Sequence, residues 1–282
     1  MAQQWRASYL NQGERDRPGM VGYPLMDLVW IKLLLTPLAI TAIALAGRRW
    51  GPAVGGWVAG LPLTSGPVSL YLALEQGRTF AATAAVSSLA CGAAVGGVCL
   101  AYAAAASRGG WIAGTACGLS VFFCTAALLL FLPLSLLPTF VAVTLLLAGV
   151  RFLLPVPDRV MGDMTAPWWD LPSRVVVATG IVLLLTEGAQ ILGPKWSGLL
   201  APFPLFVNVT VAFAHRNHGV QAGILVLRGT VTALFAFAVF FLVVGGLLPR
   251  IGIGWTYAIA AAMAITINGF SLRRIHGNIE VD

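Results

Sequence analysis

The chain has 282 residues, of which 59% are hydrophobic and 10% charged, and its mean hydropathy is +0.88. Soluble domains carry roughly 25% charged residues, so this composition excludes an ordinary water-soluble fold. The formal charge of +7 comes from Lys and Arg residues scattered singly or in pairs. Because they form no basic cluster, we expect no nucleic-acid partner and interpret them as anchors at an anionic membrane surface, with membrane lipids as partners.

Long uncharged runs predict an all-α fold, a polytopic transmembrane helix bundle. Phe80–Ser107 and Trp111–Val150 both exceed the roughly 20 apolar residues with which a helix crosses the hydrocarbon layer. Charged residues, Pro and Gly between the runs predict about nine spans. These are 25–47, 52–74, 79–106, 110–131, 133–154, 172–192, 195–214, 219–248 and 252–272.

In chain order, the predicted spans divide the protein into five parts. A polar N-terminal tail, 1–24, precedes a first transmembrane repeat, 25–131; a connecting span and loop, 132–171, leads to a second repeat, 172–272, and a polar C-terminal tail, 273–282. The bias of Lys and Arg between the loops favours a cytoplasmic C-terminus only slightly. We therefore expect a multi-pass protein of a bacterial inner membrane.

The second span, 52–74, is interrupted by Pro62, Gly66 and Pro67. Proline frees backbone polar groups, and inside a membrane such groups must line a cavity or face protein. The interruption predicts hydrogen-bonding groups for a substrate at the middle of the membrane. The alternative is a kinked helix packed for structure alone, since Gly and Pro are common in membrane helices.

The segment formed by Thr64-Ser65-Gly66-Pro67 and the following Val68–Gly77 is similar to a segment of known membrane proteins. This segment resembles the broken-helix segment of bacterial LrgB-type and AbrB-type membrane proteins, and also a group of uncharacterised proteobacterial membrane proteins. The resemblance covers under a tenth of the chain. It implies an inverted-repeat transporter architecture and implies nothing about the substrate.

The sequence matches itself at a fixed offset of 142 residues. Between 51 and 77 the match gives seven identities in 27 ungapped positions, and Pro62 falls on Pro204. Composition alone would give roughly two or three. Since one connecting span separates two groups of four, the second repeat would enter the membrane from the opposite side. Inverted repeats with matching interrupted spans are typical of secondary transporters; coincidence in a Gly- and Ala-rich chain is the alternative.

The candidate site residues follow from the two interruptions and from ionisable residues in or beside spans. For substrate binding we expect Thr64, Ser65, Gly66, Pro67, Pro204, Asn208, Thr210 and Arg228. For coupling or gating we expect Glu187, Glu75, His215 and His218. Buried charges are costly in a membrane, and a guanidinium binds carboxylate or phosphate. A structural Arg228–Glu187 pair and ordinary interfacial roles for the other ionisable residues are the alternatives.

We expect no enzyme, no metal and no cofactor. The chain contains no His-Glu-x-x-His, Gly-x-Ser-x-Gly or phosphate-loop motif, and His215 and His218 are its only closely spaced histidines. The sequence favours a secondary transporter of a small-molecule substrate, anionic or amphiphilic, working by alternating access. A lipid flippase or membrane-embedded lipid-handling transferase, and a structural or channel-forming subunit, are the alternatives, and a homodimer stays open.

Overall fold

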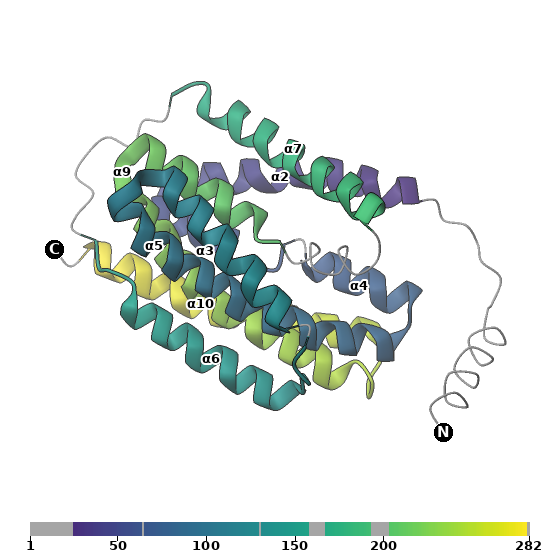
Figure 1. The fold of residues 1–282 in the computed structure, drawn as a ribbon. Helices are drawn as coiled ribbons and strands as arrows, with labels where there is room; N and C mark the ends of the chain where they lie inside the picture. The colour runs from purple at the N-terminus through teal and green to yellow at the C-terminus, as the bar shows by residue number, and fades with distance from the viewer. Residues whose placement is uncertain (1–24, 64, 130, 158–166, 193–202, 281–282) are drawn as a thin grey trace.

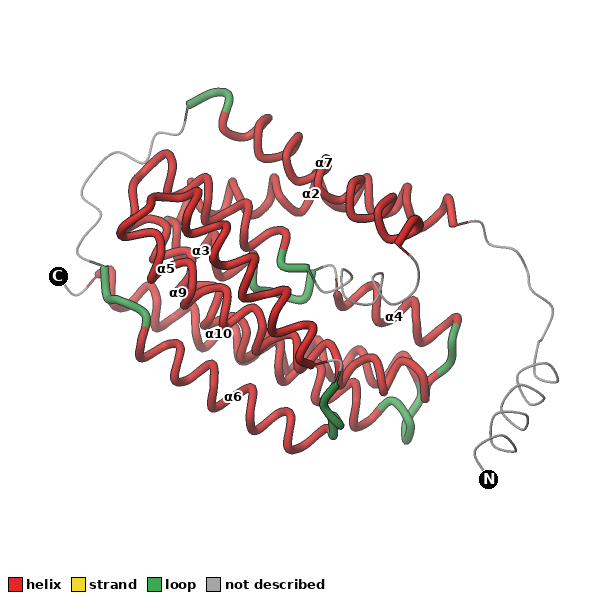
Figure 2. Tube along the Cα trace, viewed as in Figure 1, coloured by secondary structure: helices red, strands yellow, loops and turns green. Residues whose placement is uncertain are grey.

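The structure is a computed structural model that describes residues 25–63, 65–129, 131–157, 167–192 and 203–280. This part of the chain is all-α, as Figures 1 and 2 show. Its eight helices are α2 (Leu25–Trp50), α3 (Pro52–Ala59), α4 (Ser65–Glu75), α5 (Arg78–Leu129), α6 (Leu136–Leu153), α7 (Asp170–Leu192), α9 (Leu205–Leu247) and α10 (Ile253–Glu280).

The two longest helices are sharply bent. Gly110 in α5 and Gly219 in α9 have φ angles of 70° and 83°, which glycine adopts without steric cost. Beyond the bend of α5, Gly114 lies against Tyr102 and Gly118 against Val98, so the two arms pack antiparallel. Figure 1 shows α5 folding back on itself. The boundary predicted between the spans 79–106 and 110–131 coincides with this bend.

The second arm of α9, residues 220–247, is the central element of the bundle. α9 packs against α3, α5, α6, α7 and α10. Its buried side chains lie around most of the helix circumference, with Phe241 and Leu227 fully buried. A helix that is hydrophobic all round belongs inside a bundle, which explains this central position.

The outer helices present large apolar side chains. Four described helices are long and apolar enough to cross a membrane: α5, α6, α9 and the Ile253–Phe270 part of α10. On α6, Phe152 is 90% exposed and Leu145 is 68% exposed. Continuous apolar surface of this kind fits contact with lipid. The protein is therefore a multi-pass membrane protein, as its composition predicted.

The second predicted span is discontinuous. Helix α3 ends at Ala59 and α4 begins at Ser65, so the gap overlaps the expected interruption at Leu61–Pro67. Phe203 and Pro204 are likewise non-helical, and α9 begins at the next residue. Residues 193–202, which contain the whole predicted counterpart of α3, lie outside the described part of the chain.

Candidate functional site

A buried carboxylate joins three helix ends. Asp170, at the start of α7, is fully buried and accepts hydrogen bonds from Arg48 Nη2 at 3.0 Å and Asn217 Nδ2 at 2.6 Å. Arg174 Nε donates to both of its carboxylate oxygens, at 3.1 and 3.0 Å. Arg48 lies at the end of α2, and Asn217 lies just before the bend of α9. One carboxylate thus connects α2, α7 and α9.

The local sequence explains why Asp170 takes this place. An acidic side chain in the first turn of a helix is stabilised by the helix dipole, and a basic residue four positions later lies on the same face. Asp170 and Arg174 have this spacing. The Arg174 guanidinium also lies over the Phe213 ring of α9, 5.1 Å from its centroid, so its apolar face is covered.

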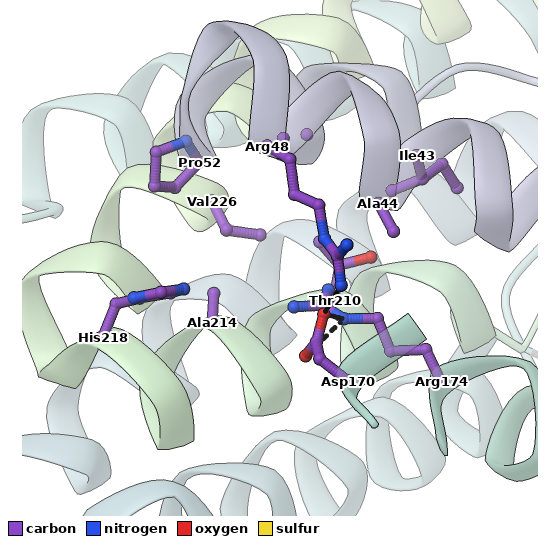
Figure 3. Close-up of a pocket in the computed structure, with 12 residues that line it drawn as sticks. Ile43, Ala44, Arg48, Pro52, Asp170, Arg174, Thr210, Ala214, His218 and Val226 are labelled. Atoms are coloured by element: carbon purple, nitrogen blue, oxygen red, sulfur yellow. Dashed lines mark hydrogen bonds and ion pairs between the residues drawn. The ribbon is translucent and has the colours of Figure 1, made fainter. Parts of the chain in front are cut away.

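These charged side chains form one side of an open pocket, shown in Figure 3. The pocket is open to solvent, and the cavity within it has a volume of about 30 Å³. Its wall comes from α2, the first turn of α3, the start of α7, and both arms of α9. The lining residues that carry polar side chains are Arg48, Asp170, Arg174, Thr210 and His218.

Two buried polar atoms on α9 lack partners near this pocket. The Thr210 hydroxyl and the Asn208 Oδ1 have no hydrogen-bond partner within the described part of the chain, although Thr210 is 3% and Asn208 6% exposed. The Asn208 Nδ2 donates to the carbonyl of Pro204 at 2.9 Å. Buried polar groups are usually hydrogen-bonded, so these two atoms are well suited to receive a ligand or water.

A stacked arginine flanks the pocket at the tip of α9. The Arg216 guanidinium lies 5.3 Å from the centroid of the Trp169 ring and 5.9 Å from that of Trp111. Trp168, the residue before Trp169, is 86% exposed. Tryptophan gathers at the boundary between membrane and water, so these rings indicate that the Asp170 cluster lies at headgroup depth.

The surroundings of the two histidines near the bend of α9 disfavour the charged form of each ring. Burial lowers the pKa of His215, which shares a 3.2 Å hydrogen bond with the Tyr102 hydroxyl. Burial is also the main cause of the lowered pKa of His218. The Asp170 carboxylate acts in the opposite direction and raises this pKa, whereas the cations Arg174 and Arg48 lower it.

We predict that this protein loses stability on acidification. Because the folded pKa values of His215 and His218 lie below the ordinary value of 6.5, the unfolded chain binds protons first, and stability falls as the pH drops through that value. Thermal unfolding of detergent-solubilised protein at several pH values measures this slope. A His215→Gln, His218→Gln double variant should show a shallower slope; an equal slope would contradict the prediction.

The substrate-binding residues predicted around the first interruption are only partly described. Thr64 lies outside the described residues. Ser65 is half-buried at the start of α4, Gly66 is buried with the Phe240 ring beside it, and Pro67 is exposed. None of these three lines the pocket.

The predicted residues of the second interruption divide between two places. Pro204, Asn208 and Thr210 are buried on or just before the first turns of α9, and only Thr210 lines the pocket. Arg228 donates to the carbonyls of Leu154 and Pro155, at 2.8 and 3.0 Å. These carbonyls close the C-terminal end of α6, where a cation is favourable, so Arg228 stabilises that helix end.

The predicted coupling residues are also dispersed. His218 lines the pocket and His215 lies within one helical turn of it on α9, whereas Glu75 is exposed at the end of α4. The side chain of Glu187 lies outside the described residues, so its expected pairing with Arg228 is not described.

Sequence reasoning missed three charged residues that line the pocket, Arg48, Asp170 and Arg174, and also Asn217, which donates a hydrogen bond to Asp170. One signal was present, because Asp27-Leu28 and Asp170-Leu171 open the two halves in the same way, each followed by a basic residue. That pattern supports a repeat and does not by itself indicate a site. A carboxylate next to an apolar run in a chain with few charges could have been proposed as buried.

Comparison with known proteins adds no assignment. No protein-family model, curated protein or solved structure matches this chain. In the described residues, no group of three or more His, Cys, Asp or Glu side chains could hold a metal ion. The functional argument therefore rests on the interrupted helices and the pocket.

Proposed function

We propose that this protein is a secondary transporter of a small anionic or amphiphilic solute, working by alternating access. The observation that carries the proposal is the depth of the break between α3 and α4 and of the start of α9. A Cβ added to Gly60, at the end of α3, would lie 2.8 Å from the carbonyl oxygen of Thr230 and 2.9 Å from the Cβ of Ala233. Thr230 and Ala233 are near the middle of the second arm of α9.

The start of α9 lies at the same level. In the α9 hairpin, Gly223 packs against His215, equally far from the bend at Gly219. With the same rise per residue in both arms, Asn208 is level with Thr230, and Pro204 is level with Leu234. A helix break and a helix start at mid-bundle depth supply polar backbone groups where a continuous apolar helix would supply none, as transporter sites require.

The helix boundaries support two repeats. The helical arm that follows Gly110 in α5 and helix α10, which begins after Gly252, are separated by the offset of 142 residues found in the sequence. Gly77 and Gly219, again 142 apart, both have positive φ, at 87° and 83°. Bends and boundaries of helices therefore recur at the 142-residue interval found in the sequence, and they do so outside residues 51–77 as well.

The packing of α2 against α7 supports an inverted arrangement. These helices are counterparts in the proposed repeats, and they pack against each other. The end of α2, at Arg48, meets the start of α7, at Asp170, so the two run in opposite directions (Figure 1). Counterparts related by an axis in the membrane plane run antiparallel, which fits nine crossings with the second repeat inverted.

The arginines favour one orientation in the membrane. Tracing the chain through the two hairpins, we assign six described arginines to the Asp170 side: Arg48, Arg49, Arg108, Arg151, Arg174 and Arg216. Arg78 and Arg250 fall on the opposite side. Cytoplasmic loops carry the excess of Lys and Arg, so we propose that the Asp170 side and the C-terminus face the cytoplasm of a bacterial inner membrane.

Alternating access predicts two-sided exposure of the helix interruptions. After replacement of the four native cysteines, Ser65→Cys and Asn208→Cys should react with a membrane-impermeant sulfonated thiol reagent in both inside-out and right-side-out vesicles. A Leu145→Cys control, on the 68% exposed face of α6 that fits lipid, should not react. The extent of labelling from each side is measured on denatured, fluorescently tagged protein.

The other outcomes decide between the remaining functions. Labelling from one side only, or from neither, would contradict alternating access and favour a structural role. Two-sided labelling together with sustained ion conductance in planar bilayers would favour a channel. A lipid-handling protein is the second candidate, because the Arg48 and Arg174 guanidiniums lie at headgroup depth in an open pocket.

A further inference from the structure

We propose that the pocket between α2, α3, α7 and α9 binds an oxyanion, a carboxylate or a phosphate, at the cytoplasmic mouth of the transport path. This inference rests on the proposed transport function for its role, since it assigns the substrate class, whereas binding itself can be measured without transport. The site differs from the mid-membrane positions predicted from the sequence, because its cations lie at the helix ends.

The charge of the pocket is unbalanced. Arg48 and Arg174 contribute two positive charges and Asp170 one negative charge, which leaves a net charge of +1 with His218 neutral. Within the described residues, Arg48 uses only Nη2 and Arg174 only Nε to bind Asp170. A guanidinium has five N–H donors, so both keep donors for a second oxyanion.

The inner wall of the pocket offers a neutral donor. The Thr210 hydroxyl is buried in the wall and has no partner among the described residues. Pro52 and Gly55, in the first turn of α3, line the same space, so the positive end of that helix dipole faces the pocket. Guanidinium and hydroxyl donors beside the positive end of a helix dipole suit a carboxylate or a phosphate group.

The position of the pocket suits the first step of transport. Thr210 is two residues from Asn208, which is level with both helix interruptions, so the pocket reaches from headgroup depth toward the broken region. Arg48 is half of a contact that ties α2 to α7. An anion that draws Arg48 away from Asp170 would loosen this contact, and substrate binding would then be coupled to opening between the proposed repeats.

The test is equilibrium binding of radiolabelled inorganic phosphate to the full chain in phosphatidylcholine nanodiscs, with acetate as a competing carboxylate. Arg48→Gln should weaken phosphate binding about tenfold or more, because it removes a charge-assisted hydrogen bond. Thr210→Val, which keeps shape and removes the hydroxyl, should weaken it about threefold to tenfold. Arg49→Gln is the matched control, an exposed neighbouring charge outside the pocket, and should change binding less than about twofold.

A second arm separates free anions from lipid headgroups. If the site takes a free anion, the protein should bind phosphate equally well in nanodiscs that contain phosphatidylglycerol. If the lipid headgroup occupies the site, phosphatidylglycerol should weaken phosphate binding by the parent protein and should have a smaller effect on Arg48→Gln. Equal losses of phosphate binding in Arg48→Gln and Arg49→Gln would overturn the site. Unchanged phosphate binding in both Arg48→Gln and Thr210→Val would overturn it as well. So would the absence of phosphate binding in nanodiscs both with and without phosphatidylglycerol. Arg48-dependent binding together with one-sided cysteine labelling would keep the site and reject transport.

Discussion

Replacing Gly56 with alanine is expected to separate α3 from α9 and to destabilise the protein strongly. A Cβ at Gly56 would lie 1.9 Å from the carbonyl oxygen of Val226, and one at Gly229 would lie 1.9 Å from that of Ala53. Both obstacles are backbone, which cannot rotate away. Overpacking typically costs about 1–3 kcal/mol and more where backbone must move, so we expect about 3 kcal/mol for each alanine.

Gly149→Ala is the matched control, because a Cβ there meets no atom within 4 Å. Alanine also favours a helix over glycine, so this variant should be as stable as the parent or slightly more stable. The measurement is thermal unfolding in detergent, with the yield of monodisperse protein as a second readout. If Gly56→Ala and Gly229→Ala unfold at the parental temperature, the close α3–α9 contact is wrong.

The helical architecture was predictable because its signals are local. Uncharged runs predict membrane helices by length, and the predicted boundary near 110 coincides with Gly110, whose positive φ turns α5 back on itself. The close approach of α3 and α9 also has a local trace, since Gly56 and Gly60 are spaced as in small-residue helix contacts. The sequence does not say which helix they meet, because Val226 lies far along the chain.

The pocket was less predictable because its residues come from three distant segments. Arg48, Asp170 and Asn217 each resemble an ordinary interfacial residue at a helix end when considered alone. Only the packing of α2 beside α7, and the hairpin of α9, brings them to one carboxylate. Arg228 illustrates the opposite case: a charge within an apolar run predicted a ligand site, but its guanidinium binds the carbonyls that end α6.

Removal of the Asp170 carboxylate should have a comparably large effect. In Asp170→Ala, the Arg174 side chain, 8% exposed, would keep its charge without a carboxylate partner, whereas Arg48, 33% exposed, could regain water. Breaking a buried ion pair by removing one partner costs about 3–5 kcal/mol. We expect a loss near the lower end, about 3 kcal/mol, because the pocket beside Arg174 is open.

A charge-removing double variant separates lost pairing from lost packing. Asp170→Ala with Arg174→Met removes both buried charges and keeps the apolar stem over Phe213, so it should recover much of the stability lost in Asp170→Ala. Glu75→Ala, which removes an exposed carboxylate at the far end of α4, is the control and should unfold like the parent. Unfolding in detergent reports all three. If Asp170→Ala and Glu75→Ala are equally stable, Asp170 does not hold α2, α7 and α9 together. An anion that draws Arg48 away from Asp170 would then not loosen the contact between α2 and α7.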